Sequence, residues 1–98
     1  MAALTINYYK TTLVLVGAQQ IQAPQLPAIL KESVAIGATT TPATEIPIGV
    51  RLAELHTDTD CYLEYGTSPS ATTLWEMGAG ETRFYGVEAS NKFAVKEK

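Results

Sequence analysis

Short runs in which apolar and polar residues alternate follow one another along most of the chain, and such runs are typical of β-strands with one buried face. Residues 4–8 alternate and are rich in β-branched and aromatic side chains, while the apolar run at residues 12–16 predicts a second strand. Later runs predict strands at residues 50–55, 60–65, 73–77, 81–87 and 92–95. Short turn-forming connectors separate these later runs, at nearly the spacing of roughly 8–12 residues expected of a sandwich or barrel. The pattern predicts an all-β fold.

Three segments carry a weaker pattern. Residues 19–27 contain two prolines, which cannot donate to a strand ladder, so this segment is predicted to be an extended connection or an edge segment. Residues 29–36 fit either two turns of helix or a strand, and the apolar end of the segment before Gly37 favours a strand there. Residues 37–47 are predicted to be a low-complexity loop with no pattern that would bury a face.

The length of 98 residues allows one hydrophobic core and therefore one domain, residues 1–98. Within it we expect core strands over residues 48–95 and an extended N-terminal segment, residues 1–27, of arm or edge strands. The predicted architecture is a small antiparallel β-sandwich or jelly-roll-like domain. Because strand addition satisfies exposed edge groups, residues 1–16 could add a strand to a neighbour, with residues 22–27 as the hinge.

Alternation also assigns the faces of the later strands. Cys61, Leu63 and Tyr65 share one face of their strand and are expected to point into the core. Trp75 and Met77 likewise stand on one face of theirs. One face of each strand can therefore supply the core.

The opposite faces are not fully polar, which predicts an interface. Tyr62, Leu74 and Tyr85 are left on the outer face of a simple monomer, with Phe84 pointing away from Tyr85. Outward aromatic and apolar residues favour an oligomer interface. The residues predicted to form it are Tyr8, Tyr9, Tyr62, Leu74, Trp75 and Tyr85.

The charge of the chain limits the classes of partner that it is expected to bind. Net charge is −3 and the seven basic residues are scattered, which argues against sequence-independent binding to nucleic acid. Charged residues make up 17% of the chain, below the roughly 25% of an average soluble domain, so we expect a partner to cover part of the surface. The longest apolar run, residues 13–16, is too short to span a bilayer, and no signal peptide pattern precedes it. We expect synthesis in the cytoplasm and no membrane partner.

Residues able to carry chemistry are few and isolated. Asp58 and Asp60 are predicted to form a turn, because a calcium ion needs more oxygen ligands than this pair offers. His56 is the sole histidine and is predicted to be a polar residue at a strand end. Cys61, the sole cysteine, is expected to be a buried thiol, and residues 78–80 a tight turn. We predict no catalytic, cofactor or metal site, and no enzyme.

Four aromatic residues have two interpretations. Trp75, Tyr62, Tyr65 and Tyr85 could form a platform on which a sugar or a base stacks. Aromatic residues at alternating strand positions are more often part of a core or an interface. The sequence is compatible with both.

Two stretches of the second half have a more specific pattern. Residues 51–72, RLAELHTDTDCYLEYGTSPSAT, and residues 74–87, LWEMGAGETRFYGV, resemble small virion proteins of tailed bacteriophages, of the capsid decoration (cement) type. The resemblance covers roughly residues 49–95. It lies in strands and turns rather than in a catalytic signature, so no functional residue is carried over.

The resemblance implies a role in the virion. A decoration protein of this type would lie on the capsid surface as a β-sandwich or jelly roll and stabilise the head by bridging major capsid subunits. It would be non-enzymatic, need no cofactor and act as a homo-oligomer, a dimer or trimer. The alternatives are a carbohydrate-binding module or a tail or neck adaptor of the virion.

Overall fold

The described part of the chain, residues 2–16, 19–69 and 75–98, forms eight β-strands and no helix in the computed structural model. The prediction of an all-β fold is confirmed. The runs at residues 4–8 and 12–16 were predicted as two strands but belong to one. The strands are β1 (Ala3–Val16), β2 (Gln19–Ala35), β3 (Thr41–Pro42), β4 (Leu52–Thr57), β5 (Cys61–Gly66), β6 (Glu76–Met77), β7 (Thr82–Gly86) and β8 (Lys92–Glu97).

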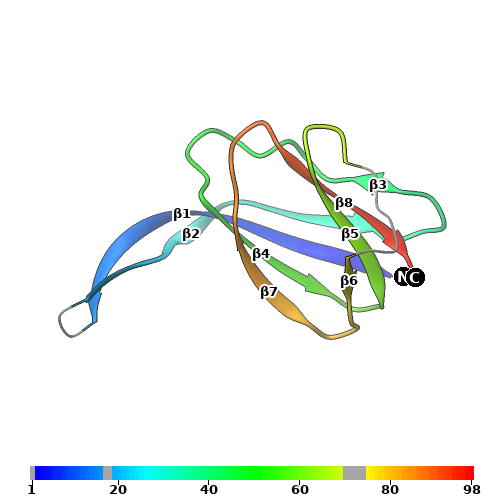
Figure 1. Ribbon diagram of the computed structural model, residues 1–98, viewed down its shortest axis with the longest axis horizontal. Helices are drawn as coiled ribbons and strands as arrows, with labels where there is room; N and C mark the ends of the chain where they lie inside the picture. Colours follow the sequence, from blue (N-terminus) through cyan, green and yellow to red (C-terminus); the bar gives the residue numbers. More distant parts are fainter. Residues whose placement is uncertain (1, 17–18, 70–74) are drawn as a thin grey trace.

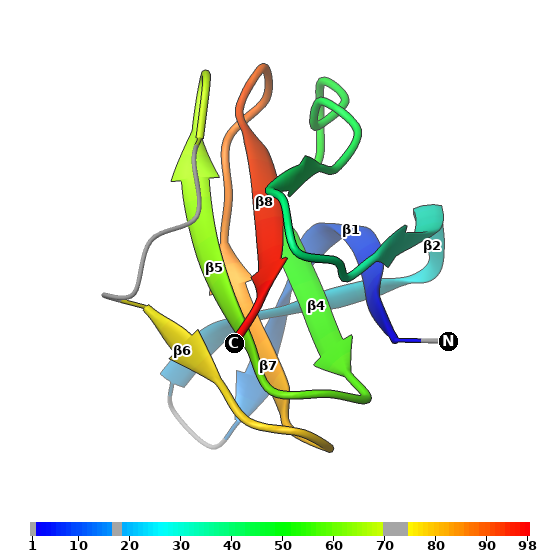
Figure 2. The same ribbon diagram turned by 90° about the vertical axis from the view of Figure 1, so that its right-hand side faces the viewer.

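Two antiparallel sheets of four strands each make up the body of the molecule. Their strand orders are β2-β1-β4-β7 and β3-β8-β5-β6. Figures 1 and 2 show one sheet lying over the other. The buried side chains between the sheets form a common hydrophobic core.

Alternation along the strands explains how this core is filled. Leu4, Ile6 and Tyr8 of β1 are almost completely buried, and in β5 Cys61 and Leu63 are fully buried. The intervening residues face outward, as the period of two requires. The largest fully buried side chains are Tyr8, Phe93, Leu4, Ile6, Leu55, Leu63, Met77, Val50, Val95, Thr57 and Cys61.

The segment that fitted either helix or strand is the second half of β2. Its register with β1 runs from Ala3↔Ala35 to Tyr8↔Leu30, so its backbone groups pair with a neighbouring strand instead of with one another. Val34 is buried against the core in this arrangement. Pairing with β1 therefore decides between the two local possibilities, as tertiary contacts commonly do.

The loop over residues 37–47 differs from the prediction, because part of it is buried. Ala43 and Ile46 are 8% and 2% exposed and belong to the core. Their amides donate to the carbonyl oxygens of Phe93, at 2.7 Å, and Asn91, at 2.8 Å. Residues 37–47 are therefore not a loop throughout: they include β3, and two apolar residues of a segment without a regular pattern are held against the core by these hydrogen bonds.

Tyr8 belongs to the core rather than to the predicted interface. Its hydroxyl donates to Glu32 Oε1 at 2.8 Å, and the same carboxylate oxygen accepts from the amide of Thr44 at 3.0 Å. Burial and the neighbouring carboxylate raise the pKa of Tyr8, so the phenol stays protonated and remains a donor. This contact joins β1, β2 and the loop that follows β3.

The paired ends of β1 and β2, up to Val16 and from Gln19, project beyond both sheets (Figure 1). The ladder between β1 and β4 ends at Tyr9↔Leu52, whereas the ladder between β1 and β2 continues to Val16↔Gln19. We call residues 10–16 and 19–25 the arm. A register shift lies at its base, where Tyr8↔Leu30 is followed by Lys10↔Gln25.

The arm changes the picture of the N-terminal segment. Residues 19–27 belong to β2, the outermost strand of its sheet, in agreement with the predicted edge segment. Over residues Leu4 to Tyr9, β1 has β2 along one edge and β4 along the other, so this part of the strand has no open edge. Strand addition by the whole of residues 1–16 is therefore wrong; only the arm extends past the body.

We predict that Tyr8→Phe destabilises the protein by about 1.5–3 kcal/mol, because a fully buried tyrosine loses its hydrogen bond to a carboxylate. Tyr9→Phe is the matched control, since Tyr9 donates to Glu54 Oε1 at 3.1 Å on the outer face. There we expect a loss below about 1 kcal/mol, because water replaces the partner. Urea unfolding followed by circular dichroism measures both, and a larger loss for Tyr9→Phe than for Tyr8→Phe would contradict the assignment.

Candidate functional site

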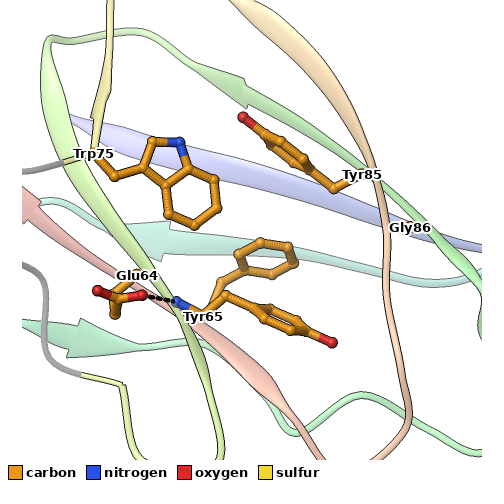
Figure 3. Close-up of a pocket in the computed structure, with 6 residues that line it drawn as sticks. Glu64, Tyr65, Trp75, Tyr85 and Gly86 are labelled. Carbon is orange, nitrogen blue, oxygen red and sulfur yellow. Dashed lines mark hydrogen bonds between the residues drawn. The ribbon is translucent and has the colours of Figure 1, made fainter.

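A pocket of about 250 Å³ lies between the edges of the two sheets. One sheet ends there with β7 and the other with β6, so the two sheets are not joined by a strand at this side. The lining residues are Glu64, Tyr65, Trp75, Tyr85, Gly86 and Phe93. Figure 3 shows the aromatic side chains of this group turned toward one another. We call it the aromatic pocket.

The rings of the aromatic pocket stand at steep angles to one another. Trp75 and Tyr85 meet edge to face, with centroids 5.3 Å apart and an interplanar angle of 89°. Tyr65 and Phe93 are 5.0 Å apart and tilted by 53°. Tyr85 is also tilted against Phe93, at 6.4 Å and 44°. Such arrangements are favourable between aromatic rings, and here they form walls rather than a flat surface.

Hydrogen bonds at the hydroxyl groups hold the two tyrosines in place. Tyr65 Oη accepts from the amide of Glu88 at 2.8 Å and from Asn91 Nδ2 at 3.1 Å. Tyr85 Oη accepts from Arg83 Nη1 at 3.2 Å. The ring positions are therefore fixed before any ligand arrives.

Arg83 is itself paired, so its charge is balanced beside the pocket. Its Nε lies 2.6 Å from Glu81 Oε2. The hydrogen bond from Arg83 lowers the pKa of Glu81, and the hydrogen bond to Glu81 raises the pKa of Arg83. Both groups are partly exposed, and we expect the pair to orient Tyr85 more than to stabilise the fold.

Three of the four residues of the predicted platform come together. Trp75, Tyr65 and Tyr85 all line the aromatic pocket, whereas Tyr62 does not. Tyr62 lies opposite Glu76 and Lys96 in its sheet, between two fully buried neighbours, and so faces outward.

The structure corrects the predicted position of Tyr85. Tyr85 lies opposite the buried Ala53 and packs against the core, so it faces inward, and Phe84 is the exposed residue at 53%. The reason is register, because the pairing of β7 with β4 selects which of two adjacent aromatic residues points inward.

The remaining predicted interface residues lie apart from one another. Tyr9 is on the outer face of its sheet, bonded to Glu54 beside Asn7. Leu74 lies outside the described residues. Phe93, which was not predicted as a site residue, completes the aromatic pocket; its position in the apolar run at residues 92–95 was the signal that could have indicated it.

Asp58 and Asp60 serve the turn between β4 and β5. Asp58 Oδ1 accepts from the amide of Ala3 at 2.9 Å, and Asp60 Oδ1 accepts from the amide of Ala79 at 2.8 Å. Within residues 2–16, 19–69 and 75–98, no group of three or more metal-ligating side chains lies together. The two carboxylates tie the first residues and the turn before β7 to this end of the body.

His56 and residues 78–80 also have structural partners. His56 Nδ1 lies 2.8 Å from Thr82 Oγ1 on the adjacent strand, and the imidazole is exposed. In the turn, the amide of Glu81 donates to Gly78 at 3.0 Å, and Gly80 has a φ of 82°, which glycine adopts without strain. These observations agree with a strand-end histidine and a tight turn.

The Cys61 thiol is fully buried. Burial raises its pKa, although a hydrogen bond with Thr57 acts in the opposite direction. Since the thiolate is the reactive form, the native protein holds a thiol that is both inaccessible and protonated at neutral pH.

We predict that Ellman's reagent labels Cys61 at least tenfold more slowly in the native protein than in urea, because the thiol has to be exposed and deprotonated before it reacts. The increase in absorbance at neutral pH gives both rates. Free cysteine in the same urea concentration corrects for the effect of the solvent. Equal rates in the two states would show that the thiol is accessible.

No family model, curated protein or solved structure matches this chain. In the part of the chain that the structure describes, there is no helix of the length and hydropathy needed to cross a membrane.

Proposed function

We propose that this protein is a non-enzymatic structural component of a bacteriophage virion, a capsid decoration protein that stabilises the head by bridging major capsid subunits. The observation that carries the proposal is the arm, which extends past the body of the molecule (Figure 1). The molecule measures 46 Å in its longest direction and 26 and 23 Å in the other two. A domain of this size gains reach toward neighbouring subunits from such an extension.

The composition of the arm favours burial against a partner. Residues 11–30 contain no charged residue, and the arm lies within this stretch except for Lys10. A two-stranded ribbon is marginally stable in water by itself. Natural proteins protect open strand edges with charges, particularly lysine. An uncharged ribbon without that protection is suited to being covered in an assembly.

The two strands of the arm differ in their ability to accept a further strand. β2 carries Pro24 at the position opposite Thr11, and Pro27 follows at the base of the arm. Proline lacks the backbone donor that a ladder needs. The β1 strand of the arm contains no proline. We therefore propose that a partner strand adds to β1, the mode of binding in which main-chain hydrogen bonds supply the affinity.

A jelly-roll arrangement is part of this proposal. In a jelly roll the strand pairs nest, as though one long antiparallel ribbon had been folded over on itself. The pairs β5–β6, β4–β7 and β3–β8 nest in this manner. β2 then pairs with β1, which takes the place of a strand that would follow β8. This pairing supports a circularly permuted jelly roll, a fold class that includes viral capsid proteins.

The assignment to a virion rests on the resemblance of residues 51–72 and 74–87, since a fold by itself does not determine function. We propose the major capsid protein as partner and a homo-oligomer, a dimer or trimer, on the capsid surface. Repetition of one modest contact over the symmetric shell would then supply the stabilisation.

We predict that replacing residues 11–24 with Asn-Gly abolishes binding to capsids that lack this protein. The replacement joins Lys10 to Gln25, which already lie opposite each other, through a turn suited to a two-residue hairpin. Because every core residue that the structure describes lies outside the arm, far-UV circular dichroism and cooperative unfolding should be retained. Co-sedimentation with capsids measures binding.

Phe84→Ser is the control for the arm deletion, because it removes an exposed aromatic side chain from the body. Capsid binding by this variant should stay within about twofold of that of the parent protein, the scale of a surface substitution. If the arm deletion binds as well as the parent protein, the arm is not the docking element.

The number of copies in purified particles distinguishes the head from other locations. We expect quantitative mass spectrometry to give a ratio to the major capsid protein near one or a simple fraction of one, because decoration proteins follow the symmetry of the shell. A ratio near one to several dozen would favour the tail or neck adaptor. Absence from the particles would contradict the virion proposal.

A further inference from the structure

We propose that the aromatic pocket is a binding site for a small organic cation, specifically a quaternary ammonium group of the choline type. The proposal is independent of the function proposed above, because the pocket lies between the sheet edges and the arm lies outside the body. It rests on four observations: the angles between the rings, the engaged hydroxyl groups, the carboxylate of the lining and the size of the pocket.

The ring angles favour a cation over a sugar. The face of an aromatic ring carries negative potential, so a cation is attracted when it is near one or several faces. The ring planes of Trp75 and Tyr85 are nearly perpendicular (Figure 3), and those of Tyr65 and Phe93 are tilted by 53°. A sugar ring stacks on one flat platform, whereas perpendicular walls match a rounded cation that presents methyl groups in several directions.

The hydroxyl groups of the pocket are engaged elsewhere. Tyr65 Oη accepts two hydrogen bonds, from Glu88 and Asn91, and Tyr85 Oη accepts one from Arg83. Because these oxygens already accept hydrogen bonds, the tyrosines offer a sugar few further acceptors, and a sugar loses affinity when its hydroxyl groups are buried without partners. A quaternary ammonium group has no donors to satisfy, and so it tolerates this lining.

The charge of the lining has the required sign. Among the lining residues that the structure describes, Glu64 is the one with a charged side chain, and its carboxylate accepts a hydrogen bond from the amide of Tyr65 at 3.0 Å. The nearby positive charge of Arg83 is paired with Glu81 at 2.6 Å. The formal charge of the lining therefore favours a positive ligand over an anion.

Size restricts the ligand further. At about 250 Å³ the pocket is smaller than the roughly 300–1,000 Å³ of sites for drug-sized ligands. A trimethylammonium group fits such a volume, and a chain of sugar units does not. The same group could arrive as free choline or as the headgroup of phosphatidylcholine, and the experiment separates the two.

The chain contains one tryptophan, Trp75, so its fluorescence reports directly on the aromatic pocket. We expect choline chloride to give a saturable change in fluorescence, with sodium chloride at equal ionic strength as the blank. The neutral isostere 3,3-dimethyl-1-butanol should bind about tenfold more weakly, because it lacks the charge that interacts with the ring faces. Methyl β-glucoside should give no saturable change. Calorimetry on the same solutions detects binding that leaves the fluorescence unchanged.

Two variants locate the site. Glu64→Gln changes a partly exposed side chain and should weaken choline binding severalfold while leaving the isostere unaffected. Phe84→Leu, on the neighbouring but exposed position of β7, should leave both affinities unchanged. Tyr85→Leu should abolish binding, and its circular dichroism spectrum shows whether it is folded.

The outcomes decide the proposal. Equal affinity for choline and the isostere, saturation by the glucoside at lower concentration than by choline, or neither heat nor fluorescence change with choline would each overturn it. If choline binds, flotation with phosphatidylcholine vesicles but not with phosphatidylglycerol vesicles assigns the ligand to a lipid headgroup. Choline binding without flotation assigns it to the free solute.

Discussion

The pairing of β1 on both of its edges is the constraint on which the rest of the structure depends. Between Leu4 and Tyr8 this strand pairs with β2 on one side and β4 on the other, and its inward side chains lie in the core. Beyond Tyr9 the same strand leaves the sheet with β2. The β1–β2 ladder, with one register shift, therefore joins the arm to the part of β1 that supplies Leu4, Ile6 and Tyr8 to the core.

The aromatic pocket follows from the small size of the domain. With four strands in each sheet, the sheets end at β7 and β6 without a strand that joins them. Apolar surface would reach solvent at this side, and large rings cover it more completely than aliphatic side chains do. Tyr65 and Tyr85 bury their rings and keep their hydroxyl groups at polar partners. The rings that cover the open side of the sandwich are therefore the same rings that line the aromatic pocket.

Much of the fold could be predicted from the sequence because alternation is strong in residues 61–65 and in the runs that follow. It could not decide between helix and strand for residues 29–36, because the deciding contact is with β1, about 25 residues away. Nor could it orient β7, since Phe84 and Tyr85 are both aromatic and either face satisfies the pattern. For the aromatic pocket, Trp75, Tyr65 and Tyr85 were recognisable in the sequence. Phe93 joins them because β8 pairs with β5, which sets Phe93 opposite Tyr65, and because Tyr85 of the other sheet packs against this pair, and neither contact is recorded in a local pattern.

Because of the register shift at the base of the arm, the number of residues in segment 26–29 matters more than which amino acids they are. Between Tyr8↔Leu30 and Lys10↔Gln25, β1 advances by two residues and β2 by five. β2 thus advances by three residues more than β1, and three is an odd number. Because side chains alternate between the two faces of a sheet, even-numbered residues of β1 lie opposite even-numbered residues of β2 before the shift and opposite odd-numbered residues beyond it. Inserting or deleting a single residue within residues 26–29 would exchange the two faces of the whole distal strand. Evolution can therefore vary the amino acids of this segment more freely than it can change their number.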